Sequence, residues 1–123
     1  MKIVFASGNA GKLKEAREIF AGHEIISIKD LCKDFAPEEK GDSFFQNAVI
    51  KAEEAMKIVK DTAVLSDDSG LIVEALDGAP GVYSSRYGGV EGDNALNRRK
   101  LLHELDGVED RSAYFSCTAV LLF

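Results

Sequence analysis

The sequence predicts a mixed α/β domain, because short apolar runs typical of buried strands alternate with stretches of helical periodicity. The chain has 123 residues, of which 46% are hydrophobic and 29% are charged, a composition typical of globular proteins and not of disordered ones. Its length lies in the common range for one domain and is enough for a hydrophobic core. No internal repeat or low-complexity segment is visible.

Apolar runs and helical spacing divide the N-terminal part of the chain into three expected elements: a strand at 2–6, a helix at 12–20 and a strand at 24–28. Leu13, Ala16, Ile19 and Phe20 are expected to share one face of that helix, and Gly22 provides a stop after it. The following segment 33–40 is charged and contains proline, so we expect a loop there.

The clearest predicted helix covers 43–60, and Asp42 or Ser43 can cap its start. Its apolar side chains recur at helical intervals along one stripe, at Phe45, Ala48, Val49, Ala52, Met56 and Val59. Asn47 and Lys51 lie one turn apart beside that stripe, where they form either part of a site or a solvated helix face.

Two adjacent acids, Asp67 and Asp68, follow the apolar run 62–65, where we expect a strand to end in a tight turn. Neighbouring carboxylates repel each other unless a cation or a hydrogen-bond network offsets their charge. Carboxylate oxygens suit Mg²⁺, which is held by one or two carboxylates together with substrate phosphates. The pair therefore indicates either a metal site or an ordinary type I turn.

The segment Ser7-Gly8-Asn9-Ala10-Gly11-Lys12 joins the first predicted strand to the first predicted helix. It fails as a Walker A loop, because its glycines are too close together and Leu13 follows the lysine. Backbone N–H groups at a helix start, with polar side chains and a lysine, still form a suitable anion site. The alternative is an ordinary strand-to-helix turn with a solvated lysine.

The C-terminal part of the chain is expected to be irregular and glycine-rich over 76–92, helical over 93–105 and extended over 113–123. The helix is expected to bury Leu96, Leu102 and Leu105. The last strand is apolar and ends without a turn former or polar tail, so we expect a longer protein or a second chain that covers it.

Charge and composition exclude several classes of partner. A formal net charge of −6 argues against a broad electrostatic surface for DNA or RNA, although an anionic small molecule fits a local cleft. No apolar run approaches membrane-spanning length, so we expect no membrane partner. Cys32 and Cys117 lack any CxxC pattern, which favours reduced, mostly buried thiols in a cytoplasmic protein.

Four motifs occur in order: Ser7-Gly8-Asn9-Ala10-Gly11-Lys12-Leu13-Lys14-Glu15, Glu39-Lys40-Gly41-Asp42-Ser43-Phe44-Phe45-Gln46-Asn47-Ala48 with Lys51-Ala52, Ser66-Asp67-Asp68-Ser69-Gly70-Leu71, and Gly78-Ala79-Pro80-Gly81-Val82-Tyr83-Ser84-Ser85-Arg86-Tyr87. Together they closely resemble the inosine triphosphate pyrophosphatase family, whose members hydrolyse the non-standard purine nucleotides dITP, ITP and XTP. The resemblance implies a long curved sheet flanked by helices, a cleft between two lobes and a homodimer. Residues 1–123 would then be the N-terminal part of one such domain, truncated at its C-terminal end.

The resemblance also implies roles for individual residues. Triphosphate binding falls to Ser7, Gly8, Asn9, Ala10, Gly11 and Lys12, with Lys51 reaching the phosphates from its helix and Ser69 contacting the substrate. Glu39 and Asp68 are implied as Mg²⁺ ligands, and Asp68 also as the residue that activates water. Asp67, Asn47 and Arg86 are expected to support the site.

The implied reaction is Mg²⁺-dependent hydrolysis of a nucleoside triphosphate to monophosphate and pyrophosphate. One departure from the family is large: its members continue with a Phe-Gly-Tyr-Asp segment, a lysine and a Ser-His-Arg segment that hold the purine base, and none of these occurs here. An alternative is therefore a nucleotide-binding fragment or assembly partner without catalytic activity. A related pyrophosphatase that acts on pyrimidine or modified nucleotides is a third possibility.

Overall fold

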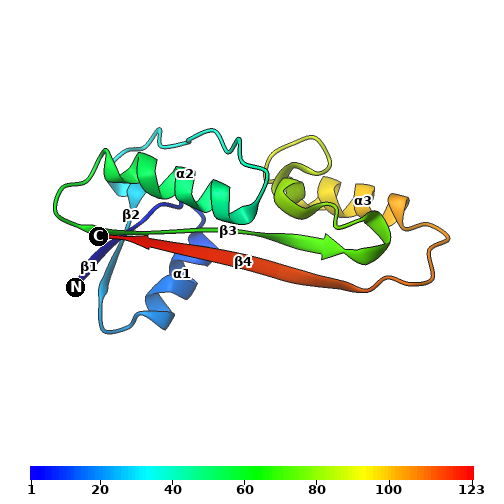
Figure 1. Ribbon diagram of the computed structural model, residues 1–123, viewed down its shortest axis with the longest axis horizontal. Helices are drawn as coiled ribbons and strands as arrows, with labels where there is room; N and C mark the ends of the chain where they lie inside the picture. Colours follow the sequence, from blue (N-terminus) through cyan, green and yellow to red (C-terminus); the bar gives the residue numbers. More distant parts are fainter. The chain divides into compact units, whose positions relative to one another are not determined.

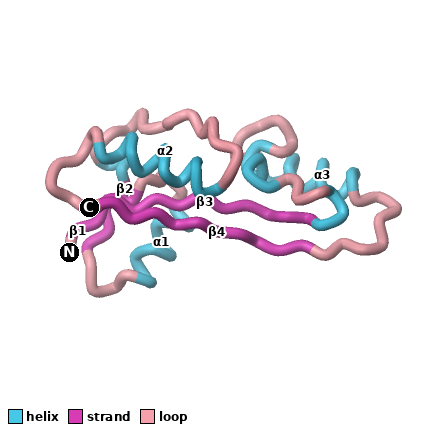
Figure 2. The backbone as a smooth tube through the Cα atoms, in the orientation of Figure 1, coloured by secondary structure: helices cyan, strands magenta, loops and turns pink.

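The computed structural model describes residues 1–123 and groups them into two compact units. The first unit comprises Met1–Asp68 and Thr118–Phe123, and the second comprises Ser69–Cys117. Two long strands, β3 (Ala63–Val73) and β4 (Ala113–Leu122), contribute residues to both units. Figure 1 shows the course of the chain, and Figure 2 separates its helices from its strands.

The four strands form one sheet in the order β2-β1-β3-β4. The strand β1 (Lys2–Phe5) runs parallel to both of its neighbours, β2 (Glu24–Ser27) and β3. Its last residue, Phe5, is in register with the last residue of β2 and with Leu65 of β3. The chain leaves the sheet after Phe5, whereas β3 continues beyond Leu65.

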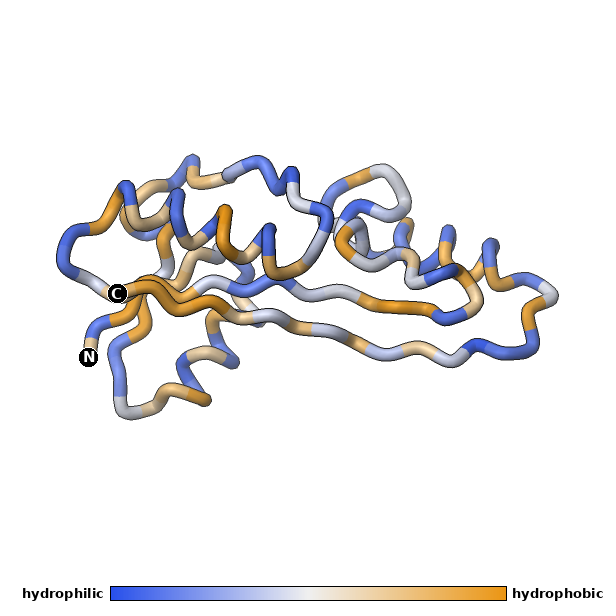
Figure 3. Tube along the Cα trace, in the orientation of Figure 1, coloured by the Kyte–Doolittle hydropathy of each residue, from blue (hydrophilic) through white to orange (hydrophobic).

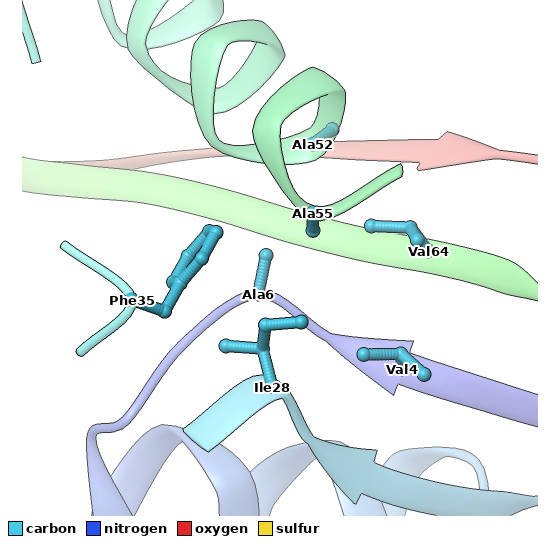
Figure 4. Close-up of a cluster of buried hydrophobic side chains, with 7 residues drawn as sticks. All are labelled: Val4, Ala6, Ile28, Phe35, Ala52, Ala55 and Val64. Carbon is cyan, nitrogen blue, oxygen red and sulfur yellow. The ribbon is translucent and has the colours of Figure 1, made fainter. Parts of the chain in front are cut away.

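Helices cover both faces of the sheet in the first unit (Figure 1). The helix α1 (Ala10–Ile19) buries Ala16 against the side chains of one face: Ile3, Phe5, Ile25, Ala63 and Leu65. The helix α2 (Phe44–Met56) buries Ala52 and Ala55 against the opposite face, in the cluster of Figure 4 with Val4, Ala6, Ile28, Phe35 and Val64. Successive residues of β1 and β3 alternate between these clusters because side chains along a strand point to opposite faces.

The strand order of the sheet reverses at β1. The connection from β1 through α1 leads to one neighbour of β1, and the connection through α2 leads to its other neighbour, on the opposite face. In open α/β sheets, such a reversal of strand order opens a crevice at the carboxyl ends of the strands, where ligands bind. Here the reversal lies between the carboxyl ends of β1 and β3.

The acidic pair does not form the turn that we predicted. Asp67 and Asp68 lie within β3, which runs without interruption from Ala63 to Val73. The prediction was wrong because it placed both carboxylates on the same side of a turn. On an extended strand they point to opposite faces, which separates the two charges and removes the reason to end the strand there.

Helix α2 is shorter than predicted, ending at Met56, and its buried face is the predicted stripe without Phe45. Ser43 is its N-cap and accepts a hydrogen bond from the Gln46 N–H, as one of the two predicted caps. The buried side chains are Asn47, Ala48, Ala52 and Ala55. Phe45 is instead 61% exposed, because small side chains allow the helix to approach the sheet closely and leave no room for an aromatic ring.

The second unit contains two 3₁₀ turns, Glu74–Leu76 and Gly81–Arg86, and the helix α3 (Asn94–Glu104). Asp93 caps α3 by accepting a hydrogen bond from the Leu96 N–H. Leu105 is buried as predicted, but Leu96 is only half-buried. Leu102 is 59% exposed, so its predicted burial is wrong.

The strand β4 lies at the edge of the sheet and exposes several large apolar side chains, Tyr114, Phe115 and Leu121. Figure 3 shows that the part of β4 near the C-terminus is the most hydrophobic. Cys117 on this strand is exposed and Cys32 is half-buried, so the predicted burial fails for Cys117. No helix has the length and apolar character that crossing a membrane requires.

Candidate active site

The segment after β1 forms an ordered turn into α1. Asn9 is the N-cap of α1: its side chain accepts a hydrogen bond from the Lys12 N–H at 3.1 Å. Ser7 Oγ in turn accepts from the Asn9 N–H at 3.1 Å, and Ser27 Oγ donates to the Ser7 carbonyl at 3.0 Å. These bonds fix the turn at the carboxyl end of β1, where the strand order reverses.

Gly8 and the helix start give this turn its capacity for an anion. A Cβ atom on Gly8 would lie 2.9 Å from Cε of Lys29, so a larger side chain there would displace the lysine stem. The first N–H groups of any α helix have no acceptor within the helix. Asn9 satisfies that of Lys12, which leaves those of Ala10 and Gly11 directed out of the helix start, where an anion is favoured.

Asp67 forms an ion pair with the lysine of this turn. Its Oδ2 lies 2.9 Å from Lys12 Nζ, and the Asp67 side chain is only 12% exposed. Asp67 lies on the face of β3 that carries α1, with Ala63 and Leu65. The predicted phosphate loop and the first acid of the pair therefore meet directly.

Asp68 faces α2 and lies near its lysine. Lys51 Nζ is 3.3 Å from Glu39 Oε1 and 4.0 Å from Asp68 Oδ1, with the Lys51 side chain 15% exposed. One ammonium group thus joins an acid of the loop before α2 to an acid of β3. Asn47 and Lys51 were expected to form either part of a site or a solvated helix face. Their burial excludes the solvated face.

Two buried polar contacts set these distances. Asn47 Oδ1 accepts a hydrogen bond from the Gly41 N–H at 2.8 Å, which holds the loop containing Glu39 against α2. Ser66 Oγ donates to the Ala48 carbonyl at 2.5 Å and is fully buried, which ties β3 to α2 immediately before the acidic pair. Sequence reasoning missed Gly41 and Ser66. Their only signal was a glycine shortly before a helix cap and a hydroxyl that ends an apolar strand.

Burial dominates the electrostatics of Asp68. It raises the pKa of the Asp68 carboxyl above its ordinary value of 3.8, and Glu39 raises this pKa further. Lys51, a hydrogen bond from Asn47 and Lys12 act in the opposite direction without cancelling the effect of burial. Asp68 is therefore a carboxylate whose charged form is only partly compensated by the protein.

The donor set fits a divalent cation. Oδ1 of Asp67 and Oδ2 of Asp68 are both buried and have no hydrogen-bond partner, although buried carboxylate oxygens normally have one. No group of three His, Cys, Asp or Glu side chains is close enough to complete a metal site. Mg²⁺ does not need one, because it retains waters and takes phosphate oxygens alongside one or two carboxylates.

The structure brings most of the predicted site residues together in the first unit: Ser7, Gly8, Asn9, Ala10, Gly11, Lys12, Glu39, Asn47, Lys51, Asp67 and Asp68. Ser69 and Arg86 belong to the second unit. Ser69 directly follows Asp68 in β3 and is half-buried, and Arg86 stacks over the Tyr83 ring with 5.2 Å to its centroid.

A family model described as the Ham1 family matches residues 3–123, nearly the whole chain. The chain belongs to the Ham1 family. Among curated relatives, a dITP/XTP pyrophosphatase of Treponema denticola is 50% identical over 99% of this chain and 64% of its own length. One of Listeria monocytogenes is also 50% identical, over 95% of this chain and 59% of its own length.

Solved structures of Ham1 proteins share this fold. The Staphylococcus aureus Ham1 protein matches with a TM-score of 0.86 and 42% identity, over 99% of this chain and 63% of that one. A nucleoside-triphosphatase described as a dITP/XTP pyrophosphatase, from Mycobacterium abscessus, matches with a TM-score of 0.80 and 40% identity, over 99% and 65%. The mixed α/β fold is therefore confirmed. The chain spans about three fifths of the length of these relatives.

Proposed function

We propose that this Ham1 chain hydrolyses non-standard purine nucleoside triphosphates such as dITP and XTP to the monophosphate and pyrophosphate. The observation that carries the proposal is that a lysine meets carboxylate on each face of β3: Lys12 with Asp67 on one face, and Lys51 with Glu39 and Asp68 on the other. Two of those carboxylates retain buried oxygens without a partner. The curated relatives named dITP/XTP pyrophosphatase support the choice of substrate.

In this proposal the turn from Ser7 to Lys12 binds the triphosphate through backbone N–H groups at the start of α1 and through the lysine. Lys51 approaches from α2, held between Glu39 and Asp68. The two ammonium groups stabilise the charge that develops on the leaving pyrophosphate. Both lie in ion pairs with acids of the site, so each would exchange a carboxylate contact for a phosphate contact when the substrate binds.

Glu39 and Asp68 are the residues that would hold Mg²⁺. When bound, the ion would offset the charge of the triphosphate and polarise a phosphoryl oxygen. Asp68 would accept a proton from the attacking water at one of its carboxylate oxygens. Its raised pKa favours this role, because a stronger base takes a proton more readily near neutral pH. Ser69 is proposed as a substrate contact and Arg86 as a supporting residue.

Pyrophosphate release tests the proposal. The chain is incubated with dITP, XTP, dATP and dGTP with and without Mg²⁺, and pyrophosphate is measured by a coupled assay. We expect release from dITP and XTP in preference to dATP, and only with the divalent ion. Release that ignores the base, or that persists in a metal chelator, would contradict the proposal.

The matched variants address the catalytic residue. Asp68→Asn should lower turnover of dITP at least ~100-fold, the low end for loss of a general base. The control is Asp42→Asn, which removes an exposed acid outside the cluster and should keep parental turnover. Parental turnover in Asp68→Asn would remove Asp68 from the mechanism.

The second candidate function is nucleotide binding without catalysis, as a fragment or assembly partner. It is favoured by the large apolar side chains exposed on β4, which an assembly partner would cover. Calorimetric titration with a non-hydrolysable α,β-imido dITP separates the two. Binding without pyrophosphate release would support this candidate, and light scattering would show whether the chain forms the homodimer that we propose for a cytoplasmic enzyme.

A further inference from the structure

Asn47 is a buried amide that bonds the loop before α2 and also influences Asp68 of β3. Its side chain lies in the first turns of α2, and the residue is only 2% exposed. Oδ1 must be the atom that faces the loop, because the Gly41 N–H donates to it at 2.8 Å. Asn47 also acts on Asp68, because its amide opposes the rise in the pKa of that carboxyl.

The loop on the other side of this contact has no freedom to move closer or to carry a side chain. A Cβ atom on Gly41 would lie 2.6 Å from Cβ of Gln46 and 2.7 Å from Oδ1 of Asn47. Both distances are far shorter than ordinary contacts, so only glycine lets the loop backbone rest on the start of α2. Glu39, two residues earlier, then lies 3.3 Å from Lys51.

The neighbouring Gln46 makes a similar bond without reaching Asp68. Its Oε1 accepts from the Asp42 N–H at 2.6 Å, and Gln46 is exposed. Gln46 thus helps to hold the loop at the helix start, whereas Asn47 joins the loop to the acid of β3. Gln46 and Asn47 therefore allow a comparison between a hydrogen bond that only stabilises the loop and one that aligns two carboxylates.

We propose that Asn47 is a positioning residue that sets the separation of Glu39 and Asp68, so that both can bind one divalent ion. This inference rests on the proposed function, in which those two carboxylates hold the metal. Lys51, one helical turn after Asn47, lies between the same two acids and neutralises them when no ion is bound. A hydrogen bond that orients metal ligands commonly contributes 10- to 100-fold to metal affinity or activity.

The test measures binding of Mn²⁺, used as a paramagnetic probe, by electron paramagnetic resonance on the 123-residue chain. Asn47→Ala should weaken Mn²⁺ binding at least ~10-fold. Gly41→Ala should weaken it by a similar factor, because it breaks the same bond from the loop side and leaves Asn47 and Asp68 in place. Gln46→Ala should bind Mn²⁺ within about twofold of the parent. Circular dichroism and thermal melting establish that each variant is folded.

The double variant sharpens the comparison. If both substitutions act through one bond, Asn47→Ala combined with Gly41→Ala should be little worse than either alone, whereas independent effects would multiply. Parental Mn²⁺ affinity in a folded Asn47→Ala or Gly41→Ala variant would overturn the proposal. Equal losses in Gln46→Ala would overturn it too, because the effect would then be general loosening of the loop.

A turnover measurement distinguishes this inference from the proposed function. For dITP hydrolysis, Asn47→Ala should raise the Mg²⁺ concentration needed for half-maximal rate, and excess Mg²⁺ should restore much of kcat. If the parent binds Mn²⁺ and loses it in both variants but releases no pyrophosphate, the positioning role stands and the pyrophosphatase proposal fails. If the parent does not bind Mn²⁺, the positioning role fails.

Discussion

At the scale of single residues, the charge of Asp68 works against folding. Its side chain is 14% exposed, one oxygen has no hydrogen-bond partner, and burial raises its pKa. When the pKa of a carboxyl is higher in the folded state, its contribution to the free energy of unfolding is complete below the unfolded pKa. This contribution is lost as pH rises through the folded pKa. Once Asp68 is ionised, its buried charge therefore lowers the stability of the fold.

This cost predicts opposite effects of Asp68→Asn on stability and on activity. Without metal, the variant should melt a few degrees higher than the parent at pH 7, because the amide needs no compensation for charge. At pH 3, below the ordinary Asp value, the difference should vanish, since Asp68 is then protonated in both states. Calorimetric melting at the two pH values checks this, with Asp42→Asn as the exposed control. A lower melting temperature for Asp68→Asn at pH 7 would show that the ion pair with Lys51 outweighs burial.

At the scale of elements, α2 is the part that carries the site to the sheet. Asn47 and Lys51 reach the acids of β3 and the loop only because Ala48, Ala52 and Ala55 let the helix axis come close. These alanines have no exposed surface, and Ala52 and Ala55 pack in the cluster of Figure 4. The distances in the candidate site therefore depend on methyl groups that do not touch it.

Enlarging one of these methyl groups should damage stability and activity together. Ala52→Leu inserts three carbons into a closed cluster, which should cost about 1–3 kcal/mol of unfolding free energy. It should also lower dITP turnover, because the helix must move away from β3. Urea denaturation measures the first effect. The control Glu53→Leu places the same side chain on the exposed side of α2 and should change stability by less than about 0.5 kcal/mol.

In the second unit, Tyr87 joins α3 to the turn before it. Its hydroxyl donates to Glu104 Oε2, and Lys100 Nζ lies 4.3 Å from the centre of its ring. Burial, followed by the hydrogen bond and the charge of Glu104, raises the pKa of Tyr87 to about 12. Deprotonation would remove the donor and place two negative charges side by side.

The sign of the alkaline effect follows from that shift. Because the pKa of Tyr87 is raised, its contribution to the free energy of unfolding is complete below about pH 10, the ordinary tyrosine pKa. This contribution is lost as pH rises through about 12. Compared with the parent, Tyr87→Phe should lose less stability across this interval, because it has no hydroxyl to titrate. Urea unfolding at a series of alkaline pH values measures this, and parallel losses in both proteins would contradict it.

At the scale of the whole molecule, the strand order decides where chemistry can occur. The strand order reverses at β1, and β3 continues beyond the end of β1 with one acid on each face. Lys12 from one face and Lys51 from the other each meet one of those acids. The candidate site is therefore built around a strand, with its cations supplied by helices that pack on opposite sides.

Most of the fold could be predicted from the sequence, since apolar runs and caps mark strands and helices through near neighbours in the chain. The strands 2–6 and 24–28 and the Ser43 cap correspond closely to the structure. The errors arose where the local composition or spacing of the chain indicated the wrong structure. Asp67 and Asp68 have the composition of a turn but lie within β3, and Phe45 has the spacing of a core residue but lies outside the packed face of α2.

The sequence by itself determined the motifs, their order and the resemblance to the inosine triphosphate pyrophosphatase family, because these depend only on which residues follow one another. Only the tertiary structure decided that Lys12 pairs with Asp67, that Lys51 lies between Glu39 and Asp68, and that Asn47 and Ser66 hold these parts together. The physical reason is strand alternation combined with packing on two faces. Alternation sends adjacent acids in opposite directions, and helix packing then determines which cation each one meets.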